Sequence, residues 1–232
     1  MPGFYIDSYY IILVLPCLLF GLWASFKVNS TFKKYSQVRN MRGYTGADAA
    51  KLILSRNGIS DVAVNQISGN LTDNYDPKQH AIHLSQSVYG STSVAAIGVA
   101  AHEAGHAVQH ATNYFPIKVR EVIVPVTQIG SYLYLPLIIL GAIFSYEPLV
   151  TLGIMLFATI ALFQLVTLPV EFNASRRALA ILEENEILYG DELKGAKSVL
   201  TAAALTYVAA LMTSLAQLLR LILVFGGRNR RN

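Results

Sequence analysis

The stretch PLVTLGIMLFATIALFQLVTLPVE, residues 148–171, runs for 23 residues without a charge before it reaches Glu171. As a helix rising ~1.5 Å per residue, it is long enough to cross about 30 Å of hydrocarbon. Three further stretches also lack any charge, namely residues 8–26, 122–146 and 198–219. A chain with four such stretches is predicted to be a helical membrane protein.

The composition agrees with a membrane protein and excludes other classes. Hydrophobic residues make up 53% of the 232 residues and charged ones 14%, and the mean hydropathy of +0.44 is too high for a soluble domain of this size. The formal charge of +4 comes from bases beside the apolar stretches, so we expect a lipid bilayer as a partner and no nucleic acid. The lone cysteine, Cys17, excludes an internal disulfide and a thiolate metal cluster.

Basic residues predict which side of the membrane each loop faces. Bases follow residues 8–26, which indicates an uncleaved anchor with its N-terminus outside, and residues 122–170 predict a hairpin of two spans kinked or briefly broken by prolines. Residues 198–219 fit either a fourth span or a helix that packs on its neighbours through small side chains. With four spans, 14 bases lie on one side and 3 on the other, and Arg220 lies near the boundary. We therefore expect a multi-pass cell-membrane protein whose 14-base side is cytoplasmic.

Between the first two spans, residues 27–121 have the alternating chemistry of a small folded domain. The sequence TGAD, Thr45–Asp48, is typical of a helix N-terminus, and Gly58 is placed to end that helix. Residues 62–67 and 80–84 have strand-like composition, and the segment between them is rich in turn residues. These signals predict one short helix followed by a small sheet.

A longer helix, predicted over residues 94–111, carries AAHEAGHAVQH, residues 100–110. His102 and His106 lie one turn apart and about 40° from alignment, so both imidazoles can reach one ion, and two such nitrogens suit Zn²⁺. Glu103 is rotated about 100° from His102, which places its carboxylate beside the ion as the expected general base. Zinc lowers the pKa of a bound water to about 7 and polarises a peptide carbonyl, which is the chemistry of peptide hydrolysis.

The HEAGH string is too specific for chance. With 5 histidines and 8 glutamates in the chain, random placement predicts on the order of 0.004 HExxH strings. The alternative is a polar face on a buried helix, where unpaired His and Glu would cost a few kcal/mol (~2–7). Gly105 costs about 1 kcal/mol relative to alanine inside a helix, so we expect it to serve a close approach of another backbone.

A catalytic zinc needs a third protein ligand and an open fourth position. His110 lies on the same helix about 12 Å beyond the first histidine, which is too far to join the site. The metzincin pattern is excluded because Gln109 and Thr112 stand where that pattern needs glycine and histidine. His80 and His83, in the second strand-like segment, stay unassigned.

The remaining arrangement takes a glutamate from a second helix, and Glu171 is the best placed candidate. It directly follows an apolar stretch, and it begins an alanine- and leucine-rich helix 65 residues after His106. A solvated carboxylate at the membrane interface is the alternative reading. The cluster Glu183, Glu184 and Glu186 is instead typical of a solvated helix end.

With AAHEAGHAVQ and PVEFNASRRAL both in view, the chain resembles the neutral zinc metallopeptidases of the YugP-like bacterial membrane family over nearly its whole length. The resemblance implies that His102, His106 and Glu171 bind one zinc ion per chain and that Glu103 is catalytic. More broadly, the chain is similar to gluzincins, whose second motif is ExxxD. Ser175 stands at the aspartate position, so the carboxylate that would orient a zinc-bound imidazole is absent there.

These motifs predict an α-rich α+β membrane protein, in which a small zincin-like domain with a short sheet and the HExxH helix is joined to about four transmembrane helices. By similarity to gluzincins, residues 80–84, HAIHL, are expected to form an edge strand that holds an extended peptide. The predicted parts are an anchor at 1–26, a catalytic domain at 27–121, a transmembrane hairpin at 122–170, a Glu-bearing active-site helix at 171–197, and a C-terminal transmembrane or membrane-packed helix with a basic tail at 198–232.

The predicted function is a zinc-dependent endopeptidase that cleaves peptide or membrane-protein substrates at the cytoplasmic membrane surface. Arg176, Arg177 and the 13 tyrosines are open candidates for the group that stabilises the oxyanion. One rival is a non-catalytic membrane scaffold or chaperone that holds zinc for folding. A transporter is a weaker rival, because the spans are few and no charged or broken pair of helices offers a path at mid-membrane.

Overall fold

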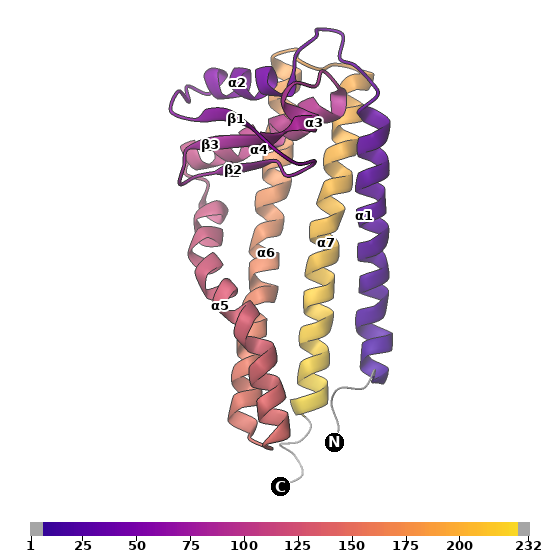
Figure 1. Cartoon of the computed structure of the whole chain (residues 1–232), viewed down its shortest axis with the longest axis vertical. Coiled ribbons are helices and arrows are strands. Elements are labelled where there is room, and N and C mark those ends of the chain that lie inside the picture. The colour runs from indigo at the N-terminus through magenta and orange to yellow at the C-terminus, as the bar shows by residue number, and fades with distance from the viewer. Residues whose placement is uncertain (1–6, 227–232) are drawn as a thin grey trace. The chain divides into compact units, whose positions relative to one another are not determined.

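The computed structural model describes residues 7–226, and helices make up most of them (Figure 1). The chain divides into two compact units. The helical unit contains residues 7–24, 118–169 and 205–226 of the described chain, and the mixed unit contains residues 25–117 and 170–204. The elements are, in order, η1 (Tyr10–Val14), α1 (Leu15–Tyr35), α2 (Gly46–Arg56), β1 (Ala63–Ile67), β2 (Asn74–Asp76), β3 (Ala81–Ser85), α3 (Gln86–Tyr89), α4 (Val94–Ala111), α5 (Phe115–Ile143), α6 (Glu147–Glu184) and α7 (Asp191–Gly226).

Four helices of the described chain are long and apolar enough to cross a membrane. They cover Tyr10–Tyr35, Phe115–Ile143, Glu147–Glu184 and Asp191–Gly226, and only 17–22% of each most apolar window is buried. Most residues of these windows are therefore not buried inside the protein, as a lipid solvent requires and water does not favour. Residues 198–219, for which the sequence allowed either a span or a packed helix, lie inside α7. This single helix of 36 residues is long enough to span a membrane. The prediction of an α-rich membrane protein with a small sheet is confirmed.

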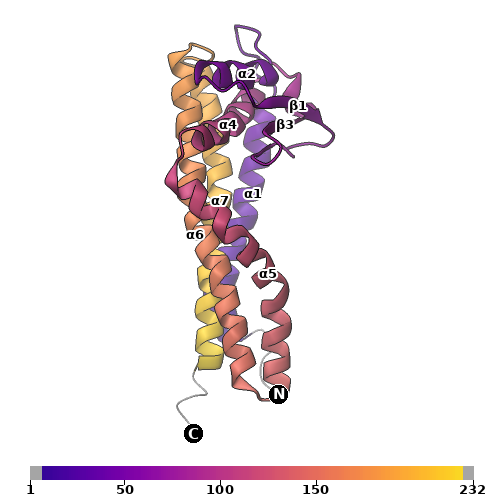
Figure 2. The same ribbon diagram turned by 90° about the vertical axis from the view of Figure 1, so that its left-hand side faces the viewer.

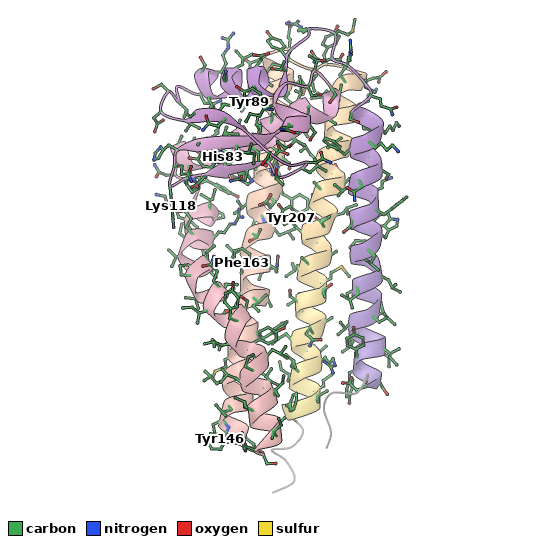
Figure 3. All side chains as sticks on the ribbon, in the orientation of Figure 1. His83, Tyr89, Lys118, Tyr146, Phe163 and Tyr207 are labelled. Carbon is green, nitrogen blue, oxygen red and sulfur yellow. The ribbon has the colours of Figure 1, made fainter. Side chains whose placement is uncertain are left out.

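Helices α5 and α6 form the predicted hairpin, with a break at residues 144–146. Ser145 has a left-handed backbone there, with φ of 51°, and Figure 3 labels its neighbour Tyr146. Pro125 and Pro136 lie inside α5, which bends along its length in Figure 2. Pro148 is the second residue of α6, where the N–H that proline lacks would have no partner within the helix.

Small residues let α5 and α6 approach closely within the helical unit. A Cβ on Gly153 would lie 2.8 Å from the Tyr134 carbonyl oxygen, and one on Gly130 would lie 3.0 Å from that of Leu156. Such contacts between backbones drive helix association in a bilayer, where burial of apolar surface gains nothing.

The sheet of the mixed unit has the strand order β1-β3-β2 (Figure 1). Strands β1 and β3 are parallel, with Ala63 opposite Ala81, and β2 is antiparallel to β3, with Asn74 opposite His83. The prediction that residues 80–84 form an edge strand is wrong, because β3 is central and its backbone is hydrogen-bonded on both sides. The two edge strands are β1 and β2, and the three residues NYD of β2 lie in the segment predicted as a turn-rich connection. Asn and Asp disfavour strands, so this strand carries no sequence signal.

The two predicted helices of this unit have the predicted boundaries and caps. Thr45 and Asp48 form a reciprocal capping box at α2, and Gly58 follows that helix with φ of 69°. Helix α4 covers Val94–Ala111, and the Ser93 hydroxyl caps it by accepting from the backbone of Ala96. Figure 2 shows α2, α4 and the sheet together. Their shared core is built from fully buried aliphatic side chains, which include Ile53, Ile82, Leu84 and Ile97.

Candidate metal centre

Helix α4 presents two imidazoles on one face. His102 and His106 are one turn apart, and their ring centroids lie 4.7 Å from each other. Seven of the other sixteen positions of this helix are alanine, and all of these alanines except Ala111 are buried. These small side chains leave room for another helix to approach α4 closely.

Helix α6 brings a carboxylate to both rings. Glu171 Oε2 lies 3.1 Å from His102 Nε2 and 3.5 Å from His106 Nε2. The potential ligand atoms of these three residues all lie within 4.8 Å of one another, and the Glu171 side chain is 3% exposed. Two imidazole nitrogens and a carboxylate oxygen fit zinc, and three protein ligands leave a fourth position for water or substrate. The structure therefore brings together the three residues that were predicted as ligands.

Gly105 permits this meeting of the two helices. A Cβ at this position would lie 2.7 Å from the carbonyl oxygen of Ala174 on α6. No real Cβ tolerates that distance, so only glycine allows α4 and α6 to pack this closely. The expectation of a close backbone approach at Gly105 is confirmed.

The carboxylate makes the cluster favourable for a cation. Burial lowers the pKa of His106, but the hydrogen bond to Glu171 and its negative charge outweigh burial, so the pKa lies above the ordinary value. A positive charge is thus stabilised between the rings. A bound Zn²⁺ would supply such a charge.

Glu103 lies next to the cluster without belonging to it. Its Oε2 accepts a hydrogen bond of 3.0 Å from the backbone N–H of Tyr75 on the edge strand β2. This bond fixes the direction of the carboxylate. The position agrees with the predicted rotation of Glu103 away from the ligand histidines.

Comparisons with known proteins identify the family of this chain. The family described as "Putative neutral zinc metallopeptidase" matches residues 10–226. The chain belongs to this family. The "Putative membrane protease YugP" of Bacillus subtilis (strain 168) is 45% identical over 216 residues, which cover 93% of this chain and 96% of that relative. No solved structure matches.

Ser175, at the aspartate position of the gluzincin motif, contacts a histidine. Ser175 Oγ lies 3.1 Å from His102 Nδ1, on the side of the ring away from Glu171. If His102 binds a metal through Nε2, its Nδ1 carries a hydrogen and donates it to the serine. The partner of His102 Nδ1 at this position is therefore a neutral hydroxyl and not a carboxylate.

The outer nitrogen of His106 has a partner that the sequence did not reveal. His106 Nδ1 lies 3.0 Å from Gln109 Oε1, and Gln109 is fully buried. In the sequence, Gln109 is notable only as a residue that excludes the metzincin pattern. The available signal is its spacing, because a residue three positions after a helical ligand lies on the same face.

The other three histidines lie outside the cluster. The His110 ring packs 5.3 Å from the ring of Tyr75, and His80 forms an exposed ion pair with Asp61. His83, which is labelled in Figure 3, lies on β3. Its buried Nδ1 has no hydrogen-bond partner among the described residues. His110 lies outside the cluster of His102, His106 and Glu171, as its distance along the helix predicts.

Proposed function

We propose that this chain is a membrane-embedded zinc endopeptidase that hydrolyses peptide bonds at the membrane surface. His102, His106 and Glu171 would hold one zinc ion per chain. Bound zinc would lower the pKa of a coordinated water and polarise the peptide carbonyl. The observation that carries the proposal is the convergence of these three donors beside a carboxylate that is already oriented.

Glu103 has the role of general base in this proposal. Its carboxylate accepts a proton from the attacking water and delivers it to the leaving amide nitrogen, so the C–N bond breaks as a neutral amine forms. The N–H of Tyr75 keeps one oxygen of Glu103 in place during both transfers. Glu103 thus acts on the reacting atoms and is the catalytic residue.

Substrates near the bilayer are the natural ones for this arrangement. Glu171 directly follows the apolar stretch of α6, so a proposed zinc ligand lies where a predicted span ends. We therefore propose that the site cleaves membrane proteins or lipid-proximal peptides. The bias of 14 bases against 3 favours a cytoplasmic site in a multi-pass cell-membrane protein.

The test compares the detergent-purified chain with Glu103→Gln and with Glu183→Gln, an exposed glutamate of α6 as a matched control. We expect one zinc per chain in all three proteins. Cleavage of casein and of a membrane-protein panel should fall at least ~100-fold in Glu103→Gln alone. Equal cleavage by wild type and Glu103→Gln, or folded wild type without zinc, would refute the proposal. Stoichiometric zinc with no cleavage by wild type would identify a zinc-stabilised scaffold instead.

A further inference from the structure

Gln109 is the most completely bonded side chain around the candidate metal centre. It is fully buried on α4, and its Oε1 lies 3.0 Å from His106 Nδ1. Its Nε2 donates to the Val170 carbonyl oxygen at 2.8 Å and to Asn173 Oδ1 at 2.9 Å, both on α6. All of these groups belong to the mixed unit. A single side chain thus connects one predicted ligand to the helix that carries another.

The partners of Gln109 decide which way round its amide lies. The carbonyl of Val170 can only accept a hydrogen bond, so the NH₂ group of Gln109 must face it. The Gln109 oxygen is then the atom that faces His106, and an oxygen can only accept. His106 Nδ1 must therefore carry the hydrogen, which leaves its Nε2 free to bind a metal on the side of Glu171.

A second, independent anchor fixes the same direction. Arg177 Nε donates to Asn173 Oδ1 at 2.8 Å, and a guanidinium has no acceptor atom. Asn173 must therefore present its oxygen between Arg177 and Gln109. The Arg177 guanidinium itself lies over the ring of Tyr114, 5.8 Å from its centroid. Hydrogen bonds connect Arg177 through Asn173 and Gln109 to His106, and each of them therefore has only one possible donor.

We propose that Gln109 is a positioning residue that holds His106 in the Nδ1–H tautomer, with its Nε2 directed at the metal position. Asn173 and Arg177 assist by keeping the Gln109 amide in its one productive orientation. The inference rests on the proposed function, because it concerns the zinc affinity of the same site. Outer partners of this kind change metal affinity by about 10–100-fold.

The first test replaces Gln109 with methionine, which has a similar volume and forms none of these hydrogen bonds. We expect Gln109→Met to bind Zn²⁺ about 10–100-fold more weakly in competition with a chelator. Gln66→Met, at an exposed glutamine of β1, is the control and should bind as wild type does. NMR of ¹⁵N-labelled histidine is a second readout, since the chain has only 5 histidines. When His106 of the metal-free protein is neutral, wild type should show the Nδ1–H signal and Gln109→Met should show a mixture of tautomers.

A second pair of variants tests the anchor without touching Gln109. Asn173→Asp keeps an oxygen that accepts from both Gln109 and Arg177, so its zinc affinity should stay within about threefold of wild type. Asn173→Leu removes that acceptor, and its affinity should fall by about 3–10-fold, because Val170 still holds one N–H of Gln109. If Gln109→Met fails to fold, this pair still tests the hydrogen bonds that orient the Gln109 amide.

Unchanged affinity and an unchanged His106 tautomer in folded Gln109→Met would overturn the role of Gln109. Equal affinities for Asn173→Leu and Asn173→Asp would overturn the role of its anchor. Either failure leaves the proposed function intact if wild type binds one zinc and Glu103→Gln loses cleavage. Absence of zinc from folded wild type would instead defeat the proposed function itself.

Discussion

Glu171 joins both histidines through one oxygen atom. Its Oε2 lies 3.1 Å from His102 Nε2 and 3.5 Å from His106 Nε2, so it compensates positive charge at the centre of the cluster. We expect Glu171→Ala to lower the zinc occupancy of the purified chain while circular dichroism shows that the helices stay folded. Metal analysis by mass spectrometry measures the occupancy, with Glu183→Gln as the control. Full occupancy in Glu171→Ala would remove this residue from the ligand set.

Ser175 supplies His102 with a neutral partner where gluzincins have a carboxylate. Because its Oγ lies 3.1 Å from His102 Nδ1, Ser175→Ala leaves that ring nitrogen without its acceptor. We expect the affinity for Zn²⁺ to fall about tenfold, at the lower end of the range for outer partners. Chelator competition measures this, and Ser175→Thr should restore the affinity because it keeps the hydroxyl. A loss in Ser175→Thr as large as in Ser175→Ala would show that packing is responsible.

The close packing of helix α4 against helix α6 depends on Gly105. In Gly105→Ala the new Cβ would lie 2.7 Å from the Ala174 carbonyl oxygen, so the helices must separate. We expect a loss of about 1–3 kcal/mol in the free energy of unfolding, together with weaker zinc binding. Gly90→Ala is the control, since a Cβ there meets nothing within 4 Å. Equal stability of the two variants in denaturant titrations would contradict the assigned contact.

The capping box of α2 makes the stability of the mixed unit depend on pH. Hydrogen bonds from the hydroxyl and the backbone N–H of Thr45 hold the pKa of Asp48 below its usual value. A lowered pKa adds stability above the unfolded value of about 3.9, and this stability is lost as the pH falls through the folded value. Asp48→Ala should therefore be about 1 kcal/mol less stable than wild type at pH 7. Thermal unfolding should show this gap narrowing below about pH 4, and a gap that widens in acid would refute the account.

The elements that could be predicted are those with local signals. The helical spacing of its histidines predicts α4 at residues 94–111, and the need for a third donor predicts Glu171 as a distant candidate ligand. Strand β2 was missed, because its three residues carry no alternation and are held only by pairing with β3. The bonds of Gln109 were also missed, since its partner Asn173 lies 64 residues away and no local pattern connects them.

The whole molecule should cross the membrane four times if each apolar helix spans it. The basic residues then place Phe144 and the C-terminus outside and residues 185–190, between α6 and α7, in the cytoplasm. We expect a reporter that is active only outside the cell to work when it is fused after Phe144 or after the last residue. It should be inactive when inserted within residues 185–190. A reporter that finds Phe144 in the cytoplasm would overturn this orientation.

The hydrogen bond between Tyr75 and Glu103 has a consequence for how this protein can vary. The donor is a main-chain N–H, which every residue type except proline possesses. The side chain at position 75 can therefore change in evolution while Glu103, the proposed general base, keeps its orientation. A proline there would remove the hydrogen bond, so the support of Glu103 leaves almost no trace in the amino-acid identity of its partner.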